Sequence, residues 1–331
     1  MSSLFAEAFN TESRYLMLSW RRYTLNVDWL IKKFKNYEIA SADGTAIAAA
    51  SAIKDIALKA PARSTKEFLD QINVAAYGLR EARQSSAALL NCLDYIEDAA
   101  QQVYQKKASL QKIRKTIASA CDDFVARIAD AKQRIGEIGA KRIRSGDRIL
   151  TLCRSTTVLA ILKKVKEQGK EIQVVVAESR PDLEGRLLAN EVADLGIPVT
   201  LITDFAARIF LPDIDILLTG GEAIAANGAI VSKVGTATLA ELCHAARVRV
   251  LIAVGSYKFS PETISGRLIT LEEGNPSQVV PTAEINPTVT IRNPLFDVTG
   301  HEHIDALITE RGIIPPQGVY LVFTASEQNK K

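Results

Sequence analysis

The sequence predicts an α/β protein with an N-terminal all-helical domain and a C-terminal Rossmann-like domain built on a doubly wound parallel sheet. Two observations indicate this. Residues 1–145 show almost no strand pattern and are rich in Ala, Leu, Lys, Glu and Gln, with apolar residues three and four positions apart. After residue 147, short apolar runs alternate strictly with helical patterns, which is typical of a parallel sheet with crossover helices. We therefore place the domains at residues 1–145 and 146–331.

The N-terminal domain is expected to be a set of helices. Pro61 separates the first two, and Ser64 with Glu67 has the spacing of a capping box. The last helix is long and charged, and Gly146-Asp147 ends it. The expected helices cover residues 43–60, 64–82, 84–107 and 109–144.

A separate segment, residues 1–34, precedes these helices and holds both tryptophans, Trp20 and Trp29. Arg21, Arg22 and Tyr23 stand beside the first of them. Two interpretations are open: an amphipathic helix that caps the helical domain or a neighbouring subunit, or a contact site for another protein.

In the C-terminal domain the strands are near-continuous apolar runs, so both faces of the sheet should be covered. The expected strands are residues 148–153, 172–178, 199–203, 214–220 and 249–255. The helices expected between them are residues 157–169, 183–196, 204–212 and 236–248, and Gly169 and Gly196 end the first two. The sequence has no GxGxxG motif, so nothing indicates a dinucleotide cofactor, and we expect no cofactor.

Composition excludes several classes of protein. The chain has 331 residues, 47% of them hydrophobic, and a net charge of +3, which is too small to indicate nucleic-acid binding. No apolar run reaches the length of a membrane span, and the N-terminus lacks the pattern of a signal peptide. Four well-separated cysteines fit a reducing cytoplasm and argue against zinc. His301 and His303 are the only neighbouring histidines, and a surface loop explains them without a metal.

Ionisable and hydroxyl side chains follow the expected strands at their carboxyl ends, where ligands bind in such sheets. They are Cys153, Arg154, Ser155, Thr156 and Thr157 after the first strand, Glu178, Ser179 and Arg180 after the second, Asp204 after the third, Glu222 after the fourth, and Ser256, Tyr257 and Lys258 after the fifth. Each has an ordinary structural interpretation, and a single strand-end cysteine is more often inert than reactive. Their convergence with helix N-termini favours an anionic, phosphorylated small molecule.

Five stretches resemble a known superfamily. They are IGEIGAKRIRSGDRILTLCRS, AESRPDLEGRLLANEVADLGIPVTLITD, NGAIVSKVGT, SYKFSPETISGRL and NPLFDVTGHEHIDALITERGIIPP. The superfamily contains ribose-1,5-bisphosphate isomerase, methylthioribose-1-phosphate isomerase and the regulatory subunits of translation initiation factor 2B. The resemblance runs from about Lys35 to Pro316, and the last two stretches look most like the archaeal ribose-1,5-bisphosphate isomerases. It implies a helical domain packed on a Rossmann-like domain, and a homodimer or hexamer.

The resemblance also implies a reaction. In the isomerases a cysteine after the first strand and an aspartate in a GAD stretch after the fourth strand exchange protons with a sugar that carries phosphate on C1. Cys153 occupies the cysteine position, and Glu222 of Gly220-Gly221-Glu222 occupies the aspartate position. A thiol and a carboxyl group on opposite sides of the sugar carbons suit ring opening and proton transfer between C1 and C2.

The sequence departs from the isomerase pattern at several ligand positions. The N-terminal arginine-glycine motif is replaced by Ala40-Ser41-Ala42-Asp43, an Asn-Lys pair has become Ser232-Lys233, and the histidine after the cysteine is Arg154. Arg83 matches a family arginine, although the proline that normally follows it is Gln84. The residues expected to bind substrate are Arg83, Arg154, Ser155, Thr156, Arg180, Ser232, Lys233 and Lys258.

Two classes of function are therefore open. The first is an isomerase of a phosphorylated ribose, with Cys153 and Glu222 as the acid/base pair. The second is a non-catalytic protein of the initiation factor 2B alpha-subunit type, which binds a sugar phosphate or nucleoside monophosphate and acts through partner proteins. Retention of Cys153 favours the first class. Glu222, which the regulatory subunits also carry, and the lost arginine motif favour the second.

Overall fold

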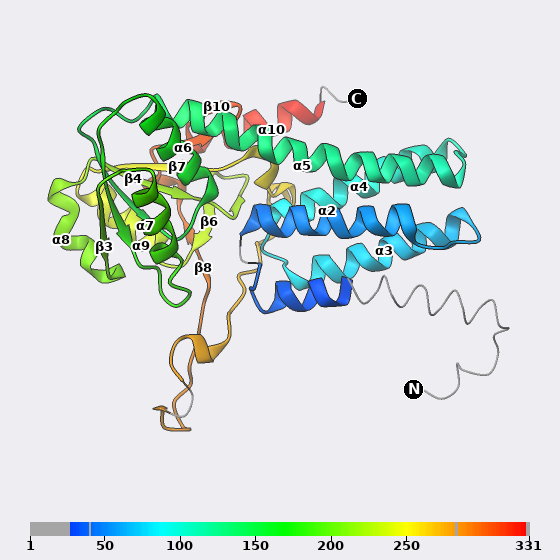
Figure 1. The fold of residues 1–331 in the computed structure, drawn as a ribbon, viewed down its shortest axis with the longest axis horizontal. Coiled ribbons are helices and arrows are strands. Elements are labelled where there is room, and N and C mark those ends of the chain that lie inside the picture. The colour runs from blue at the N-terminus through cyan, green and yellow to red at the C-terminus, as the bar shows by residue number, and fades with distance from the viewer. Residues whose placement is uncertain (1–26, 40, 282–283, 329–331) are drawn as a thin grey trace. The chain divides into compact units, whose positions relative to one another are not determined.

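The computed structural model describes residues 27–39, 41–281 and 284–328 (Figure 1). They divide into two compact units: one contains the described residues up to Arg83 together with Leu89–Ala126, and the other contains Gln84–Ala88 and the residues from Arg127 onward. The division falls inside one long helix, and the domain boundary between residues 145 and 146 stays a prediction. Trp20 and its neighbours Arg21, Arg22 and Tyr23 lie outside the described residues.

The first unit is helical, as the sequence predicts. A helix over residues 27–35 leads into it. The other helices are α2 (Ala42–Lys59), α3 (Thr65–Ala82), α4 (Ala87–Gln105) and the first half of α5 (Leu110–Ala140). Its core consists of fully buried side chains such as Phe34, Ile53, Phe68, Leu93 and Ile117. None of the helices that the structure describes is both long and apolar enough to cross a membrane.

Local hydrogen bonds set the start of α3 where the capping-box spacing predicts it. The Ser64 hydroxyl accepts a hydrogen bond from the Glu67 N–H at 3.1 Å, and the Glu67 carboxylate accepts one from the Arg63 N–H at 2.7 Å. These contacts satisfy backbone donors that a helix N-terminus leaves free.

The second unit is built on a seven-stranded sheet in the order β10-β9-β7-β4-β1-β2-β3. All neighbouring pairs are parallel except β10 and β9, which are antiparallel. The strands are β1 (Arg148–Leu152), β2 (Gln173–Ala177), β3 (Val199–Ile202), β4 (Ile216–Gly220), β7 (Arg249–Ala253), β9 (Ala306–Thr309) and β10 (Gly312–Ile314). The first five of these, in chain order, are the strands that the sequence predicts.

Helices cover both faces of this sheet, which makes it doubly wound as predicted. The crossover helices are α6 (Thr156–Glu167), α7 (Glu184–Asp194), the short α8 (Ala207–Phe210) and α9 (Thr236–Ala245), and α10 (Val319–Gln328) follows the last strand. Alternate strand residues point to opposite faces. On one face Leu150, Val175 and Ile252 share a core with α9 and α10. On the other, Ile149 and Val174 share a core with the end of α5, α6 and α7.

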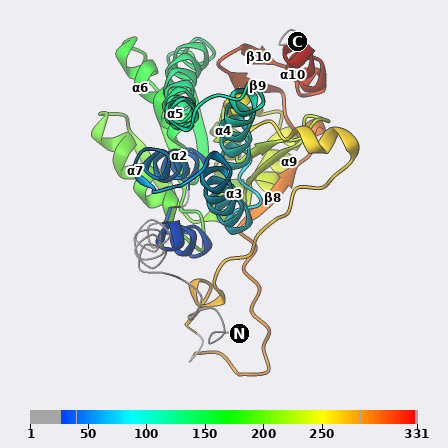
Figure 2. The same cartoon turned by 90° about the vertical axis from the view of Figure 1, so that its right-hand side faces the viewer.

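A second, three-stranded antiparallel sheet was not anticipated from the sequence, and neither were β9 and β10. It has the order β5-β6-β8 and consists of β5 (Ala223–Ile224), β6 (Ile230–Lys233) and β8 (Phe296–Thr299). Between β7 and β8 the chain makes a long excursion with few strand or helix residues, and most of its described residues are exposed. Figure 2 shows this excursion, in orange, running out from the strands and back.

Candidate active site

The strand order creates a topological switch point at β1. From β1 the chain moves to β2 and β3 on one side, and it then returns to β4 on the other side. Ligands bind at such points, outside the carboxyl ends of the strands. Cys153 directly follows β1, and Gly220 ends β4. The two loops touch, because a Cβ atom on Gly220 would lie only 2.4 Å from the Ser155 hydroxyl oxygen.

The backbone holds Cys153 in an unusual conformation. Its φ angle is 59°, in the left-handed region that few residues other than glycine adopt. The Cys153 N–H donates a hydrogen bond to the Ser179 hydroxyl oxygen at 2.5 Å. The Ser179 N–H in turn donates to the Asp204 carboxylate at 2.7 Å. Side chains after β2 and β3 therefore fix the turn that carries the thiol.

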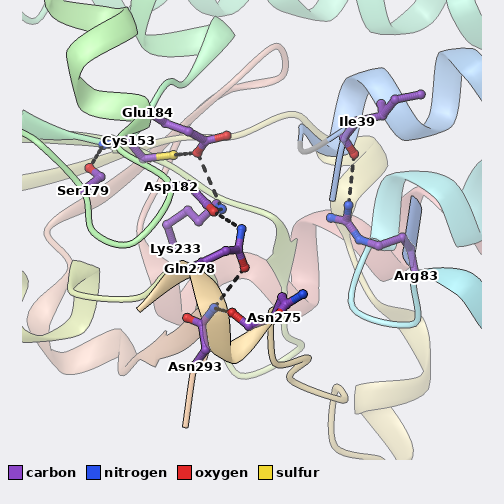
Figure 3. A network of polar contacts seen from close by, with 10 residues as sticks. All are labelled: Ile39, Arg83, Cys153, Ser179, Asp182, Glu184, Lys233, Asn275, Gln278 and Asn293. Atoms are coloured by element: carbon purple, nitrogen blue, oxygen red, sulfur yellow. Dashed lines mark hydrogen bonds and ion pairs between the residues drawn. The ribbon is translucent and has the colours of Figure 1, made fainter. Parts of the chain in front are cut away.

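The Cys153 thiol contacts a carboxylate that the sequence analysis did not identify. Its sulfur lies 2.8 Å from Oε2 of Glu184, the first residue of α7 (Figure 3). Burial raises the pKa of the thiol well above its ordinary value, and the negative charge of Glu184 raises it further, whereas Lys233 partly opposes the shift. Cys153 is therefore a protonated thiol that donates a hydrogen bond to Glu184.

Lys233, at the end of β6, lies among the same carboxylates. Its Nζ atom is 2.6 Å from Oδ2 of Asp182 and 3.6 Å from Oε2 of Glu184. Burial alone would lower the pKa of this ammonium, but the negative charges of Glu184 and Asp182 outweigh it, and the pKa is raised. Lys233 is thus a charged lysine held by two acidic residues.

Two side chains of the excursion complete this polar network (Figure 3). The Gln278 amide nitrogen donates to Oδ1 of Asp182 at 2.8 Å. The Asn293 amide nitrogen donates to the Gln278 side-chain oxygen at 3.0 Å and to the Asn275 carbonyl at 2.9 Å. Asn293 is buried, so the base of the excursion is part of the site's support.

The loop after β4 carries Glu222, whose side chain is buried. Its N–H donates to the Val231 carbonyl at 2.8 Å, which joins the loop to the second sheet. The neighbouring carbonyls are occupied as well: the Ser232 hydroxyl donates to Gly220 at 3.1 Å, and the Lys258 ammonium donates to Gly221 at 3.1 Å. Ser232 and Lys258 therefore hold the loop that carries Glu222, through the carbonyls of the two residues that precede it.

The other expected ligand residues of the carboxyl edge contact protein groups. Ser155 caps α6 by accepting a hydrogen bond from the Val158 N–H at 3.3 Å, and Thr156 is the first residue of that helix. The Arg154 guanidinium pairs with Glu191 at 2.5 Å. The Arg180 guanidinium donates to the carbonyls of Gln278 and Val279, at 3.3 and 2.6 Å.

Arg83 belongs to the helical unit. Its side chain is fully buried, and its guanidinium donates to the Ile39 carbonyl at 3.1 Å (Figure 3). The guanidinium also stacks on the Tyr37 ring, at 4.2 Å from the ring centroid. The replaced arginine-glycine motif lies in the same unit. There Ser41 caps α2 by accepting a hydrogen bond from the Gly44 N–H at 3.1 Å, and Asp43 is buried in that helix.

A model of the initiation factor 2 subunit family matches residues 38–316. The chain belongs to this family. It is 40% identical to the ribose 1,5-bisphosphate isomerase of Pyrococcus furiosus over 290 residues, which cover 87% of this chain and 90% of that protein. The resemblance that the sequence motifs predict is thereby confirmed.

Two solved structures of Pyrococcus horikoshii proteins have the same fold. The translation initiation factor eIF-2B superposes with a TM-score of 0.75 at 31% identity and covers 88% of this chain and 97% of its own. The 5-methylthioribose 1-phosphate isomerase superposes with a TM-score of 0.75 at 27% identity and covers 92% of this chain and 88% of its own. The fold thus occurs in both isomerases and initiation factors.

Within this family member, the structure adds Glu184, Asp182 and Ser179 to the set of polar residues around Cys153. Sequence reasoning placed Ser179 at the strand ends but assigned it no role, and it passed over both acidic residues. The available signal was position, since Asp182 and Glu184 follow β2 at the same edge of the sheet as Cys153. In the part of the chain that the structure describes, no group of three or more His, Cys, Asp or Glu side chains is arranged to hold a metal ion.

Proposed function

We propose that this protein is an aldose–ketose isomerase that converts ribose-1,5-bisphosphate to ribulose-1,5-bisphosphate, with Cys153 and Glu222 as the acid/base pair. The observation that carries the proposal is the position of the thiol. Cys153 follows β1 at the switch point, and the loop of Gly220 and Glu222 follows the adjacent strand β4. The named activity of the Pyrococcus furiosus relative supports the choice of substrate.

The proposed chemistry balances with two groups. Glu222, as the acid, gives a proton to the ring oxygen while the bond from that oxygen to C1 breaks. Cys153, as the thiolate, takes the proton from C2, and the electron pair of that C–H bond forms a C1–C2 double bond. The thiol then returns a proton to C1, and the Glu222 carboxylate takes the proton of the C2 hydroxyl. The product is a ketone at C2 that keeps both phosphates.

The same edge of the sheet offers groups that suit a phosphorylated sugar. The N-terminus of α6, with Ser155 and Thr156, favours phosphate through its backbone N–H groups. Arg154, Arg180, Ser232, Lys233 and Lys258 are the further proposed ligands there, and Arg83 is the proposed ligand from the helical unit. Because the structure pairs Arg154, Arg180 and Lys233 with protein groups, binding by these three requires an exchange of partners.

Phosphorus NMR of the purified protein with ribose-1,5-bisphosphate tests the activity. We expect the signal of the phosphate on the C1 ring carbon to be replaced by that of a phosphate on a CH₂ group. Glu222→Asp tests the acid: if the loop keeps the geometry of the isomerases, this variant retains or gains turnover, and if the loop suits glutamate, turnover falls. A wild-type protein and a Glu222→Asp variant that both bind the sugar without converting it would contradict the isomerase proposal.

The second candidate is a non-catalytic protein that binds a sugar phosphate or nucleoside monophosphate and regulates a partner. A specific observation favours it. At the position of the lost arginine-glycine motif, Ser41 caps α2 and Asp43 is buried in that helix, so neither residue replaces the missing arginine as a ligand. The solved initiation factor structure shares the fold. Stabilisation by AMP in a thermal-shift assay, without turnover of ribose-1,5-bisphosphate, would select this function.

We also propose that the protein assembles at least as a homodimer, which is what the family resemblance implies. Multi-angle light scattering at micromolar concentration should report a mass of two or six copies of the 36.1 kDa chain. A mass of one copy would contradict this proposal.

A further inference from the structure

We propose that Glu184 exchanges a proton directly with the Cys153 thiol, so that the two side chains act as one proton-transfer pair. The exchange itself follows from the contact between them, and its part in catalysis rests on the proposed function. The sulfur–oxygen distance of 2.8 Å is short for a thiol donor, and both side chains are only partly exposed to water. A proton can therefore pass between them without an intervening water molecule.

The fold fixes Glu184 against the thiol. Glu184 opens α7, and Leu183 before it adopts a left-handed φ of 57°. Gly185 after it lets this first turn lie against the end of β2, because a Cβ atom there would lie 1.9 Å from the Ala177 carbonyl oxygen. Cys153 is held from the other side through its N–H bond to Ser179. Both partners thus start from constrained backbone, which is what a functional contact needs.

Charge balance favours transfer to Glu184 over loss of the proton to water. The ionisable groups around the thiol are Glu184 at the start of α7 and Asp182 just before it, Lys233 from β6, and Arg154 with its partner Glu191. Ionisation to water would add a third negative charge around the single ammonium of Lys233. Transfer to Glu184 leaves the net charge of the cluster unchanged.

Lys233 makes the transfer reversible. Its ammonium lies 3.6 Å from Glu184 and 2.6 Å from Asp182, so it stabilises the carboxylate form of Glu184 in the resting state. When Glu184 holds the proton, the positive charge of Lys233 stabilises the new thiolate, since this charge opposes the rise in the pKa of the thiol. In the proposed reaction Glu184 takes the thiol proton before C2 is deprotonated and returns it after C1 has been protonated.

The test is the pH dependence of alkylation of Cys153 by iodoacetamide, followed by mass spectrometry on the folded protein. Cys153→Ser serves as the blank, since Cys92, Cys121 and Cys243 are buried. Glu184→Gln removes the charge and the proton acceptor but keeps the shape. The matched control is Glu167→Gln, on the exposed end of α6, where the carboxylate pairs with Lys164.

We expect Glu184→Gln to move the midpoint of the alkylation curve toward lower pH, so that alkylation at neutral pH is about tenfold faster than in the wild type. Glu167→Gln should leave the midpoint unchanged. A merely structural role of Glu184 would raise the reaction rate at every pH, including the alkaline plateau, without moving the midpoint. An unmoved midpoint in Glu184→Gln would overturn the proposal.

Turnover separates this proposal from the proposed function. If the protein is an isomerase, kcat of Glu184→Gln should fall as the pH drops below the midpoint of its alkylation curve, whereas the wild-type kcat should stay level there, because only the wild type passes the thiol proton to an internal acceptor. Glu184→Asp should restore part of the activity. A moved alkylation midpoint with no wild-type turnover would overturn only the isomerase function. Full turnover by Glu184→Gln would overturn the catalytic part of the pair.

Discussion

The two edges of the main sheet contain the same types of charged residue in different environments. At the amino edge, Asp215 accepts a hydrogen bond from the N–H of Arg148 in β1, and Asp305 accepts one from the N–H of Val250 in β7. The side chains of Arg148 and Arg249 are more than 40% exposed there. At the carboxyl edge, Asp182 and Glu184 pair with Lys233 of the second sheet, whose side chain is only 15% exposed. The two edges therefore differ in the burial of their paired charges and not in the types of charged residue, and buried pairs of this kind are typical of functional sites.

The largest expected effect lies at the carboxyl edge. Cys153→Ser should lower turnover of ribose-1,5-bisphosphate about 1,000-fold or more, because a hydroxyl is a far weaker acid than a thiol and does not supply the base. Ligand affinity, measured by thermal shift, should change little, since the sulfur acts in the transition state. The matched control is Cys243→Ser, on the buried face of α9, which should lower stability and leave kcat unchanged. Equal turnover in both variants would remove Cys153 from the chemistry.

A second change breaks the buried charge cluster of the same edge. Lys233→Met leaves Asp182 and Glu184 without their ammonium, and we expect the free energy of unfolding to fall by about 3 kcal/mol in urea denaturation. Lys164→Met, which removes an exposed partner of Glu167, should change it by about 0.5 kcal/mol or less. Similar losses in the two variants would show that burial does not distinguish the carboxyl edge.

A third prediction concerns Asp297, in β8 of the second sheet. Burial raises its pKa to about 6, although the N–H groups of Gly235 and Ala237 donate to its carboxylate. Because the folded pKa lies above the ordinary value of 3.8, protonation favours the folded state, and this contribution is lost as the pH rises through about 6.

We therefore compare the wild type with Asp297→Asn, whose amide oxygen still accepts both bonds. On going from pH 7 to pH 4, the wild type should gain about 1–2 kcal/mol of unfolding free energy relative to the variant. Urea denaturation at several pH values measures this difference. A difference that stays constant over this range would refute the raised pKa.

The smallest effect is expected at the amino edge. Arg148→Ala removes exposed contacts to Asp213, at 3.2 Å, and to Gln173, at 3.0 Å, and it leaves the backbone bond to Asp215 in place. Stability should change by about 0.5 kcal/mol or less, and turnover should not change. A large loss of activity from this variant would mean that the two edges are coupled.

The sequence predicted the parts of the fold that depend on local patterns. Strands β1 and β2 each begin with a polar residue that is followed by four buried and mostly apolar residues, and glycines follow the next helices, so the sequence pattern located them. Strand β5 has two residues, and the second sheet depends on pairing of Ser232 with Asp297, which lie far apart in the chain. No local pattern carries such a pairing, and this sheet was therefore missed.

The residues of the candidate site were predictable to a similar extent. Cys153 and Lys258 were proposed because strand ends are where such sheets bind ligands, and their roles stay predictions. Glu184 was missed because an acidic residue in the first turn of a helix is ordinary, as it stabilises the helix dipole there. Its contact with the thiol depends on the left-handed turn at Leu183 and on the close approach at Gly185, and both are three-dimensional facts.

The left-handed backbone at Cys153 has a consequence for evolution and for library design. At such a position glycine and asparagine are the residues that relieve conformational strain, so a screen for folding alone should enrich them at position 153. A screen for activity should enrich only cysteine. The two screens would therefore select different residues at this codon, and the difference would measure the conformational strain that the chain accepts in order to keep a thiol there.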